Sequence, residues 1–299
     1  MNTILTRSGI KSVGLLLALV ALWGTAFAFL KVALVGLSPL EVAASRLITA
    51  ALVLNVWLFL SGDQYPKDIK RWIFFFVLSL LGSIVPFTAI AWGQQVVSSG
   101  TAGLLMGVIP LLTLLLAHFY SPGERMNLFQ GVGFLVGFAG IVILMGPEAS
   151  GEVGGTSDDF LRQGAILFGA LCYALNAVVV RRLPETSPLS SATAVMSLAA
   201  LLVCPVVFVN FSHFREVDWS SLAAVLWLGM AATAVATVLL YKLIFLAGAT
   251  FASLMNYLIP CVALLSGAVF LGEIVEHRAI FALFLVLSGI GISQLFKKA

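Results

Sequence analysis

The fold is decided by an apolar stretch with a proline near its middle, residues 249–273, which reads ATFASLMNYLIPCVALLSGAVFLGE. A related stretch occurs earlier, at residues 101–124, and reads TAGLLMGVIPLLTLLLAHFYSPGE. The aligned pairs are Ala102 with Ala252, Leu104 with Leu254, Pro110 with Pro260 and, after a one-residue gap, Glu124 with Glu273. An internal repeat of hydrophobic segments predicts two homologous halves, which is how many membrane transporters are built.

The composition indicates that lipid is the solvent for most of the chain. Of the 299 residues, 61% are hydrophobic and 10% are charged, and the mean hydropathy is +1.10. Soluble domains have about 25% charged residues. Nearly charge-free runs recur that are long enough for a helix to cross about 30 Å of hydrocarbon. Because only helices and closed barrels satisfy their backbone in lipid, we expect an all-α membrane protein.

Ten transmembrane helices are expected, joined mostly by short links. The first run continues past an A-x-A pattern at residues 26–28, is too long for a signal peptide, and is interpreted as an uncleaved helix. The expected spans are 13–34, 40–60, 72–92, 100–119 and 128–146 in the first half, and 163–182, 189–210, 219–246, 250–271 and 279–296 in the second. We therefore divide the chain into a repeat at 1–147, an external linker at 148–162 and a repeat at 163–299.

Basic residues alternate across the links and predict the orientation. With the N-terminus inside, the links on the other side carry only Arg162, Arg215 and Arg278. The positive-inside rule therefore places both termini in the cytoplasm. Since each half has an odd number of spans, the second repeat enters the membrane in the opposite sense to the first, as in inverted-repeat transporters. The cytoplasmic set is Arg7, Lys11, Lys67, Lys70, Arg71, Arg125, Arg181, Arg182, Lys242, Lys297 and Lys298.

Two basic residues lie within the spans and away from the cytoplasmic side. An embedded charge costs about 2.5 to 3.5 kcal/mol on insertion scales, so it needs a partner or a function. For Lys31, near the end of the first span, snorkelling to the interface and contact with a solute are both open. For Arg46, a structural ion pair with Glu41 and a direct role in substrate binding are both open. No carboxylate lies in the middle of a span, so the interior favours a carboxylate-bearing, zwitterionic or neutral solute.

Uncharged polar and aromatic residues gather in particular spans and extend the candidate site. The amides of Asn176 and Asn256 are the clearest candidates, because a side-chain amide in the membrane has several hydrogen-bonding positions to satisfy. Their alternative role is to join helices, and the aromatic residues alternatively anchor helix ends at the interface. The further candidates are Trp92, Gln95, Tyr173, Tyr241 and Tyr257.

Other features concern bending and packing. Pro110 and Pro260 are expected to kink matched helices that line a cavity, although a purely structural kink is the alternative. Small residues in 128–146 and 279–296 predict close helix packing, either as scaffold or as the face of a homodimer.

Several other kinds of chemistry are not indicated. The sequence has no phosphate-binding loop, no H-E-x-x-H pattern and no metal-spaced Cys/His cluster, and its three cysteines lie scattered in apolar runs. We therefore expect no enzyme activity, cofactor or metal, and a gradient as the energy source. The net charge of +3 is too small to indicate a nucleic-acid partner.

The sequence resembles the EamA-type carriers of the drug/metabolite transporter superfamily over nearly its whole length. The resemblance is carried by Ala21–Thr25 (ALWGT), Lys31, the Ser38–Pro39 pair, Arg46 and the two proline-centred stretches. It implies ten helices in two repeats, with a central cavity lined mainly by the first, third, fourth, sixth, eighth and ninth spans. Trp23, which Tyr173 replaces in the second half, is then a candidate substrate-binding residue. Within the family the chain is most similar to bacterial amino-acid exporters, including those for aromatic amino acids.

These observations predict a secondary transporter that exports amino acids or related small metabolites across the bacterial inner membrane by alternating access. Its expected partners are the small-molecule substrate and membrane lipid. A drug or nucleotide-sugar type carrier of the same fold, an integral membrane enzyme and a channel are the alternatives. Matched kinks favour a carrier over a channel.

Overall fold

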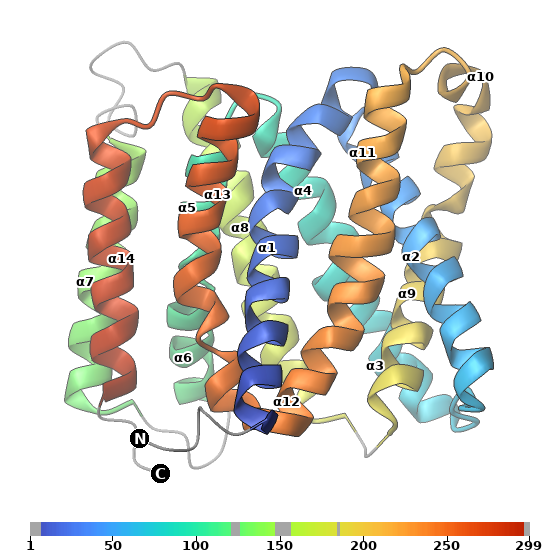
Figure 1. The fold of residues 1–299 in the computed structure, drawn as a ribbon, viewed down its shortest axis with the longest axis horizontal. Helices are drawn as coiled ribbons and strands as arrows, with labels where there is room; N and C mark the ends of the chain where they lie inside the picture. The colour runs from blue at the N-terminus through green and yellow to red at the C-terminus, as the bar shows by residue number, and fades with distance from the viewer. Residues whose placement is uncertain (1–6, 121–125, 147–156, 184–185, 296–299) are drawn as a thin grey trace.

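The computed structural model describes residues 7–120, 126–146, 157–183 and 186–295. Within these ranges the chain is helical and has no strand, which confirms the all-α prediction. The helices run side by side as a bundle (Figure 1). We call the end where α1 begins and α14 ends the terminal end, and the other end the distal end. Glu124 and residues 148–156 of the expected linker lie outside the described ranges.

The first half of the chain forms five apolar helical segments, two of which are interrupted. The third segment widens into a π-helical turn, η1, and the fourth breaks between α5 and α6. The elements are α1 (Arg7–Gly36), α2 (Pro39–Ser61), α3 (Ile69–Ser79), η1 (Leu80–Ile84), α4 (Val85–Gln94), α5 (Ser99–Met106), α6 (Ile109–Tyr120) and α7 (Leu128–Met145).

The second half repeats this order of long and interrupted helices. A second π-helical turn, η3, joins α11 to α12, and a short helix, α10, precedes α11. The elements are α8 (Ser157–Val180), α9 (Pro188–Val209), α10 (Phe211–Phe214), α11 (Trp219–Gly229), η3 (Met230–Val235), α12 (Ala236–Ala252), α13 (Met255–Leu271) and α14 (His277–Leu295).

The ten expected spans differ in length. In the described ranges, 8 helical spans are long and apolar enough to cross a membrane, and two shorter apolar helices follow, α13 and the part of α14 at His277–Ser293. A turn at Ser253 and Leu254 delays the start of α13 to Met255. At about 1.5 Å per residue, its 17 residues rise about 25 Å, less than the about 30 Å of hydrocarbon. Eight of the ten expected spans are therefore found at full length, and the ten-helix arrangement stays a prediction.

Capping residues explain where several helices begin. Ser38 Oγ accepts the backbone N–H of Glu41, while the Glu41 carboxylate accepts the backbone N–H of Ser38. This capping box satisfies two N–H groups that have no partner within the helix and starts α2. Asp68 and Asp218 cap α3 and α11 with their side chains, which accept the backbone N–H groups of Lys70 and Ser221. The two aspartates are separated by the same interval as the prolines of the sequence repeat.

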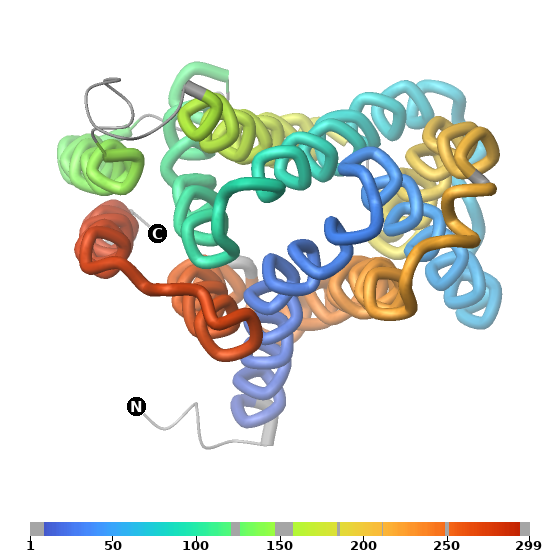
Figure 2. Tube along the Cα trace, turned by 90° about the horizontal axis from the view of Figure 1, so that it is seen from above, coloured from blue at the N-terminus to red at the C-terminus, as the bar shows by residue number. Residues whose placement is uncertain are grey.

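The two edges of the bundle are packed differently from its middle. Helices α7 and α14 lie together at one edge, and α2, α3 and α9 lie at the opposite edge (Figures 1 and 2). Between them, α1 contacts α11, α12 and α13, while α8 contacts α4 and α6. A Cβ atom on Gly133 would lie 2.5 Å from the carbonyl oxygen of Gly289, so α7 and α14 approach at a distance that only glycine allows. The small residues of these helices thus pack within the chain.

The two matched prolines differ in their local structure. Pro110 follows a break at Gly107 and Val108, and it occupies the first turn of α6. Pro260 lies inside α13, which continues through it. In the second half the chain bends earlier, at Gly248, whose φ of 83° suits glycine and few other residues. A helix break therefore lies beside Pro110, whereas a kink at Pro260 stays a prediction.

Candidate functional site

Arg46 projects from α2 among helices of both halves and is half-buried. Its Nε donates to Thr233 Oγ1 in η3 at 2.8 Å, and its guanidinium carbon lies 3.9 Å from the centre of the Phe87 ring. Over the described ranges no carboxylate forms an ion pair with it. Glu41, the partner considered from the sequence, instead contacts His213 Nδ1 at 2.9 Å. The positive charge of Arg46 is therefore stabilised by a ring and a hydroxyl, without an anion.

Tyr173 and Asn176 extend this site along one face of α8. The Tyr173 ring lies 6.5 Å from the Phe87 ring, between centres, and close enough to Arg46 to interact with its charge. Asn176 follows one turn later and rests against Gly82 of η1, where an added Cβ would lie 2.7 Å from Asn176 Oδ1. That oxygen is buried and has no hydrogen-bond partner.

We call Arg46, Phe87, Tyr173, Asn176 and Thr233 the Arg46 cluster. It presents a guanidinium over the Phe87 ring, a phenol and an amide oxygen without a partner. An unsatisfied buried acceptor costs about 1 to 3 kcal/mol, which indicates that something other than the chain completes it. The cluster therefore offers hydrogen-bond donors and an acceptor to a small polar molecule.

The π-helical turn η3 fixes one side of this cluster. Trp23 Nε1 in α1 donates to the carbonyl oxygen of Ala232 at 2.9 Å, and Thr233 Oγ1 donates to the carbonyl oxygen of Leu228 at 2.9 Å. A π turn leaves backbone groups without their usual partners, and such turns often mark functional sites. The indole N–H of Trp23 is thus already bonded to η3. The Trp23 ring can contribute only an apolar surface to a solute site.

Lys31 lies apart from the Arg46 cluster, toward the distal end. Its Nζ donates to the carbonyl oxygens of Gln94, Val96 and Val97 at 2.8, 3.3 and 3.0 Å. These carbonyls belong to the end of α4 and the turn that follows it, where the helix dipole favours a cation. Lys31 therefore joins α1 to the end of α4, and neither snorkelling nor solute contact is needed to explain its charge.

Trp92 and Gln95 lie at the exposed distal end of α4. Arg162 of α8 donates to Gln95 Oε1 at 2.6 Å and to the carbonyl oxygen of Trp92 at 2.9 Å, and its guanidinium carbon lies 4.1 Å from the Trp92 ring centre. These two residues therefore tie α4 to α8. The neighbouring Gln94 is fully buried instead and donates from Nε2 to the carbonyl oxygen of Phe27 at 3.1 Å.

Three other candidates lie on α12 and α13. Tyr241, Asn256 and Tyr257 are half-buried, and Tyr257 packs against the large core cluster. The Asn256 amide makes no hydrogen bond within the described part of the chain. Among the described residues, no hydrogen bond, ion pair or ring contact joins these three to Arg46.

Phe87 and Thr233 were not singled out as site residues from the sequence. Thr233 has a weak signal as a hydroxyl inside an apolar run, whereas Phe87 is one of 22 phenylalanines and has none. In the described ranges, no group of three His, Cys, Asp or Glu residues could hold a metal ion.

Similarity to known proteins supports a transport function. The model of the EamA-like transporter family matches twice, over residues 10–146 and 163–294. The chain is 25% identical over 261 residues to a WAT1-related chloroplastic protein of Arabidopsis thaliana, covering 84% of this chain and 61% of that protein. It is 24% identical over 281 residues to a probable terminal-alkyne amino-acid exporter of Streptantibioticus cattleyicolor, covering 94% and 92%. It is 27% identical over 172 residues to the uncharacterized inner membrane transporter YedA of Escherichia coli, covering 57% and 53%.

The fold is also similar to a solved one. A crystal structure with 18% sequence identity matches with a TM-score of 0.63 and covers 97% of this chain and 98% of the other. Because the family model matches most of the chain, the assignment is direct. This chain belongs to the EamA-like transporter family.

Proposed function

We propose that the protein is a secondary transporter that exports amino acids or related carboxylate-bearing metabolites across a bacterial inner membrane. The observation that carries the proposal is the guanidinium of Arg46, which lies among membrane-spanning helices without a carboxylate partner in the described ranges. A charge in this position is expensive and usually functional. A carboxylate of the solute supplies the missing counter-charge, because a guanidinium binds a carboxylate through two parallel hydrogen bonds.

The rest of the Arg46 cluster suits the other parts of an amino acid. The free Oδ1 of Asn176 accepts a hydrogen bond from the ammonium group of the solute. The rings of Phe87 and Tyr173 form apolar walls for a side chain. The relative named as a probable amino-acid exporter supports this class of solute. We therefore assign solute contact to Arg46, Tyr173 and Asn176, and we place Tyr241, Asn256 and Tyr257 along the terminal half of the path.

The similarity of the two halves supports the alternating-access part of the proposal. The family model matches each half separately, and the turns η1 and η3 occupy places separated by the sequence repeat interval. Helix α1 packs on α11, α12 and α13, and α8 packs on their counterparts α4 and α6. We propose two five-segment repeats of opposite orientation that rock about the Arg46 cluster, with a central cavity between them.

Contacts at the distal end define what must move. Lys31 joins α1 to the end of α4. Glu273 at the end of α13 accepts the backbone N–H of Ser99 at 2.9 Å and of Gly100 at 3.3 Å, at the start of α5. The positive-inside rule places this end outside the cell. We propose that these contacts close the path on the outside and that they separate when solute is released.

Counterflow in proteoliposomes tests the proposed function. Vesicles containing the purified protein are loaded with unlabelled amino acids, and the entry of labelled phenylalanine, alanine and glutamate is followed. We expect saturable uptake that requires internal amino acid and that falls at least tenfold in Arg46→Gln. Asp158→Asn, a change at the exposed start of α8, serves as the control. Absence of counterflow for every amino acid tested, or full activity in Arg46→Gln, would refute the proposal.

A further inference from the structure

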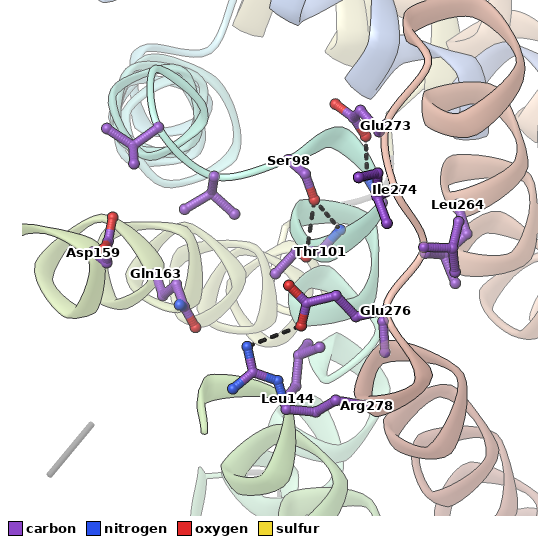
Figure 3. A pocket seen from close by; sticks show the side chains of 15 residues that line it. Ser98, Thr101, Leu144, Asp159, Gln163, Leu264, Glu273, Ile274, Glu276 and Arg278 are labelled. Carbon is purple, nitrogen blue, oxygen red and sulfur yellow. Dashed lines mark hydrogen bonds and ion pairs between the residues drawn. The ribbon is translucent and has the colours of Figure 1, made fainter. Parts of the chain in front are cut away.

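A second polar site lies at the distal end, outside the Arg46 cluster. A cavity of about 240 Å³ is enclosed by the starts of α5, α8 and α14 and by the distal ends of α7 and α13 (Figure 3). No member of the Arg46 cluster lines it. We propose that this cavity binds the ammonium group of a small organic amine or amino acid. The residues that the argument uses are Asp159, Gln163, Glu273, Glu276 and Arg278.

The charges around the cavity favour a cation. Three carboxylates lie at the cavity, those of Asp159, Glu273 and Glu276. They outnumber the two nearby positive charges, the guanidinium of Arg278 in the lining and the ammonium of Lys31, which lies behind Val96 and Val97 near Glu273. Arg278 Nη2 donates to Glu276 Oε2 at 3.1 Å, so this positive charge is already paired with one of the acids. An excess of one sign of charge around a cleft concentrates ligands of the opposite sign.

Gln163 supplies an independent indication of a ligand. Only 8% of its surface is exposed, and its Oε1 is buried without a hydrogen-bond partner. It lies one helical turn after Asp159 on α8, and its amide turns toward the side of the cavity where Glu276 and Arg278 lie (Figure 3). An acceptor left unsatisfied in this position calls for a donor from outside the chain.

An ammonium group fits these neighbours better than a metal ion or an anion. Three N–H donors can bond to an amide oxygen and to carboxylates at once. A metal ion lacks a suitable site, because no three-ligand group of His, Cys, Asp and Glu occurs in the described ranges. An anion would meet the excess of carboxylates. Leu144, Leu264 and Ala279 provide apolar wall for the rest of the ligand.

Glu273 connects this cavity to the contacts that close the distal end. Its carboxylate accepts the backbone N–H groups of Ser99 and Gly100, and a Cβ on Gly267 would clash with it. The carboxylate is therefore held in place at the start of α5, in the wall of the cavity. A bound ammonium would then lie directly beside the contacts between α5 and α13.

Equilibrium binding of labelled 2-phenylethylamine to the full-length protein in lipid nanodiscs tests this site. We expect saturable binding that unlabelled phenylalanine displaces and that 3-phenylpropionate, which lacks an ammonium group, does not. Displacement by phenylalanine identifies amino acids as ligands of the site; a lack of it identifies simple amines, and either supports an ammonium site. Gln163→Met should weaken amine binding on the order of tenfold, since a hydrogen bond to a charged group is lost.

Two further variants keep the test decisive. Glu276→Gln changes an exposed side chain, so it should fold normally and weaken amine binding. Asp158→Asn removes a carboxylate in the same helical turn as Asp159. Asp158 does not line the cavity, so this change should leave amine binding unchanged. The proposal would be overturned if the wild type showed no saturable binding, or if Gln163→Met and Glu276→Gln bound the amine as tightly as the wild type. It would also be overturned if Asp158→Asn weakened binding as much as these two variants. Amine binding is measured without transport, so it can succeed where counterflow fails. A failure of the proposed transport function can therefore be told apart from a failure of the proposed ammonium site.

Discussion

The turns η1 and η3 share a backbone form and a matched place in the chain, but their neighbours differ. Around η3, the Ala232 carbonyl accepts from Trp23, and the Thr233 hydroxyl accepts from Arg46 and donates to Leu228. Beside η1, the nearest amide is Asn176, and its Oδ1 has no partner. The comparison teaches that the polar groups at η3 are paired within the chain, whereas the amide beside η1 keeps an oxygen without a partner in the described ranges. We propose that this oxygen takes part in solute binding.

The largest expected effect concerns η3. Thr233→Val removes the acceptor of Arg46 Nε and the donor to the Leu228 carbonyl. Because hydrogen bonds to charged groups are worth about 1.5 to 3 kcal/mol, we expect the free energy of unfolding to fall by about 2 to 4 kcal/mol. Thermal or denaturant unfolding in detergent measures this loss.

The neighbouring Thr237 provides the control for that change. Its hydroxyl donates only to the Thr233 carbonyl within the same helix, at 2.7 Å. Thr237→Val should therefore cost about 1 kcal/mol or less. If the two valine variants lost the same free energy of unfolding, Thr233 would stabilise η3 no more than Thr237 stabilises its own helix. That result would contradict the role given to Thr233.

The next prediction concerns Asn176 beside η1, where a substitution should reduce transport but not stability. Asn176→Leu removes an amide oxygen that has no partner, so we expect the free energy of unfolding to change by less than about 1 kcal/mol. Counterflow should fall at least tenfold, because the solute loses its acceptor. The two quantities are measured on the same purified variant.

Asn55 is the matched control. It is also an amide in a membrane span, but its nitrogen and its oxygen both form hydrogen bonds within the chain. It donates to Ser197 Oγ at 2.8 Å and accepts from the Tyr65 hydroxyl at 2.6 Å. Asn55→Leu should lower stability by about 1 to 3 kcal/mol. A marked loss of stability in Asn176→Leu, or unchanged counterflow, would contradict the role given to Asn176.

The smallest expected effect concerns Asp218, the N-cap of α11, which leads into η3. The Ser220 hydroxyl, and then the Ser221 hydroxyl and backbone N–H, lower the pKa of Asp218 to about 2 from a usual value of 3.8. Because the folded pKa is the lower one, the ionised cap stabilises the fold above about pH 4, and this contribution is lost as the pH falls toward 2. The stability difference between wild type and Asp218→Asn should therefore be constant from pH 7 to about pH 5 and change below pH 4. A difference that varies only above pH 5 would refute this assignment.

Isolated polar residues in apolar runs were the part of the site that could be predicted. Arg46 and Asn176 stand out because a charge or an amide in a lipid-spanning helix needs a partner. The two halves were likewise visible, because the proline-centred stretch occurs twice and the family model matches each half. These inferences need only residue type and position along the chain.

Helix rotation and tertiary contacts were beyond the reach of the sequence. Gln94 and Gln95 are adjacent, yet one is fully buried and the other exposed, since neighbouring residues point about 100° apart on a helix. Lys31 was expected to snorkel or to bind solute, but the end of α4 supplies carbonyls from a distant part of the chain. Phe87 becomes important only because α2 brings a guanidinium over its ring.

The most direct test of the central claim is whether Arg46 recognises the carboxylate of the solute. Counterflow of labelled phenylalanine is measured with unlabelled phenylalanine or phenylalaninamide, which lacks the carboxylate, as competitor. In the wild type, phenylalanine should compete at least tenfold better than the amide, and in Arg46→Lys this preference should shrink, because lysine lacks the planar fork. An equal preference for the carboxylate in both proteins would contradict the account.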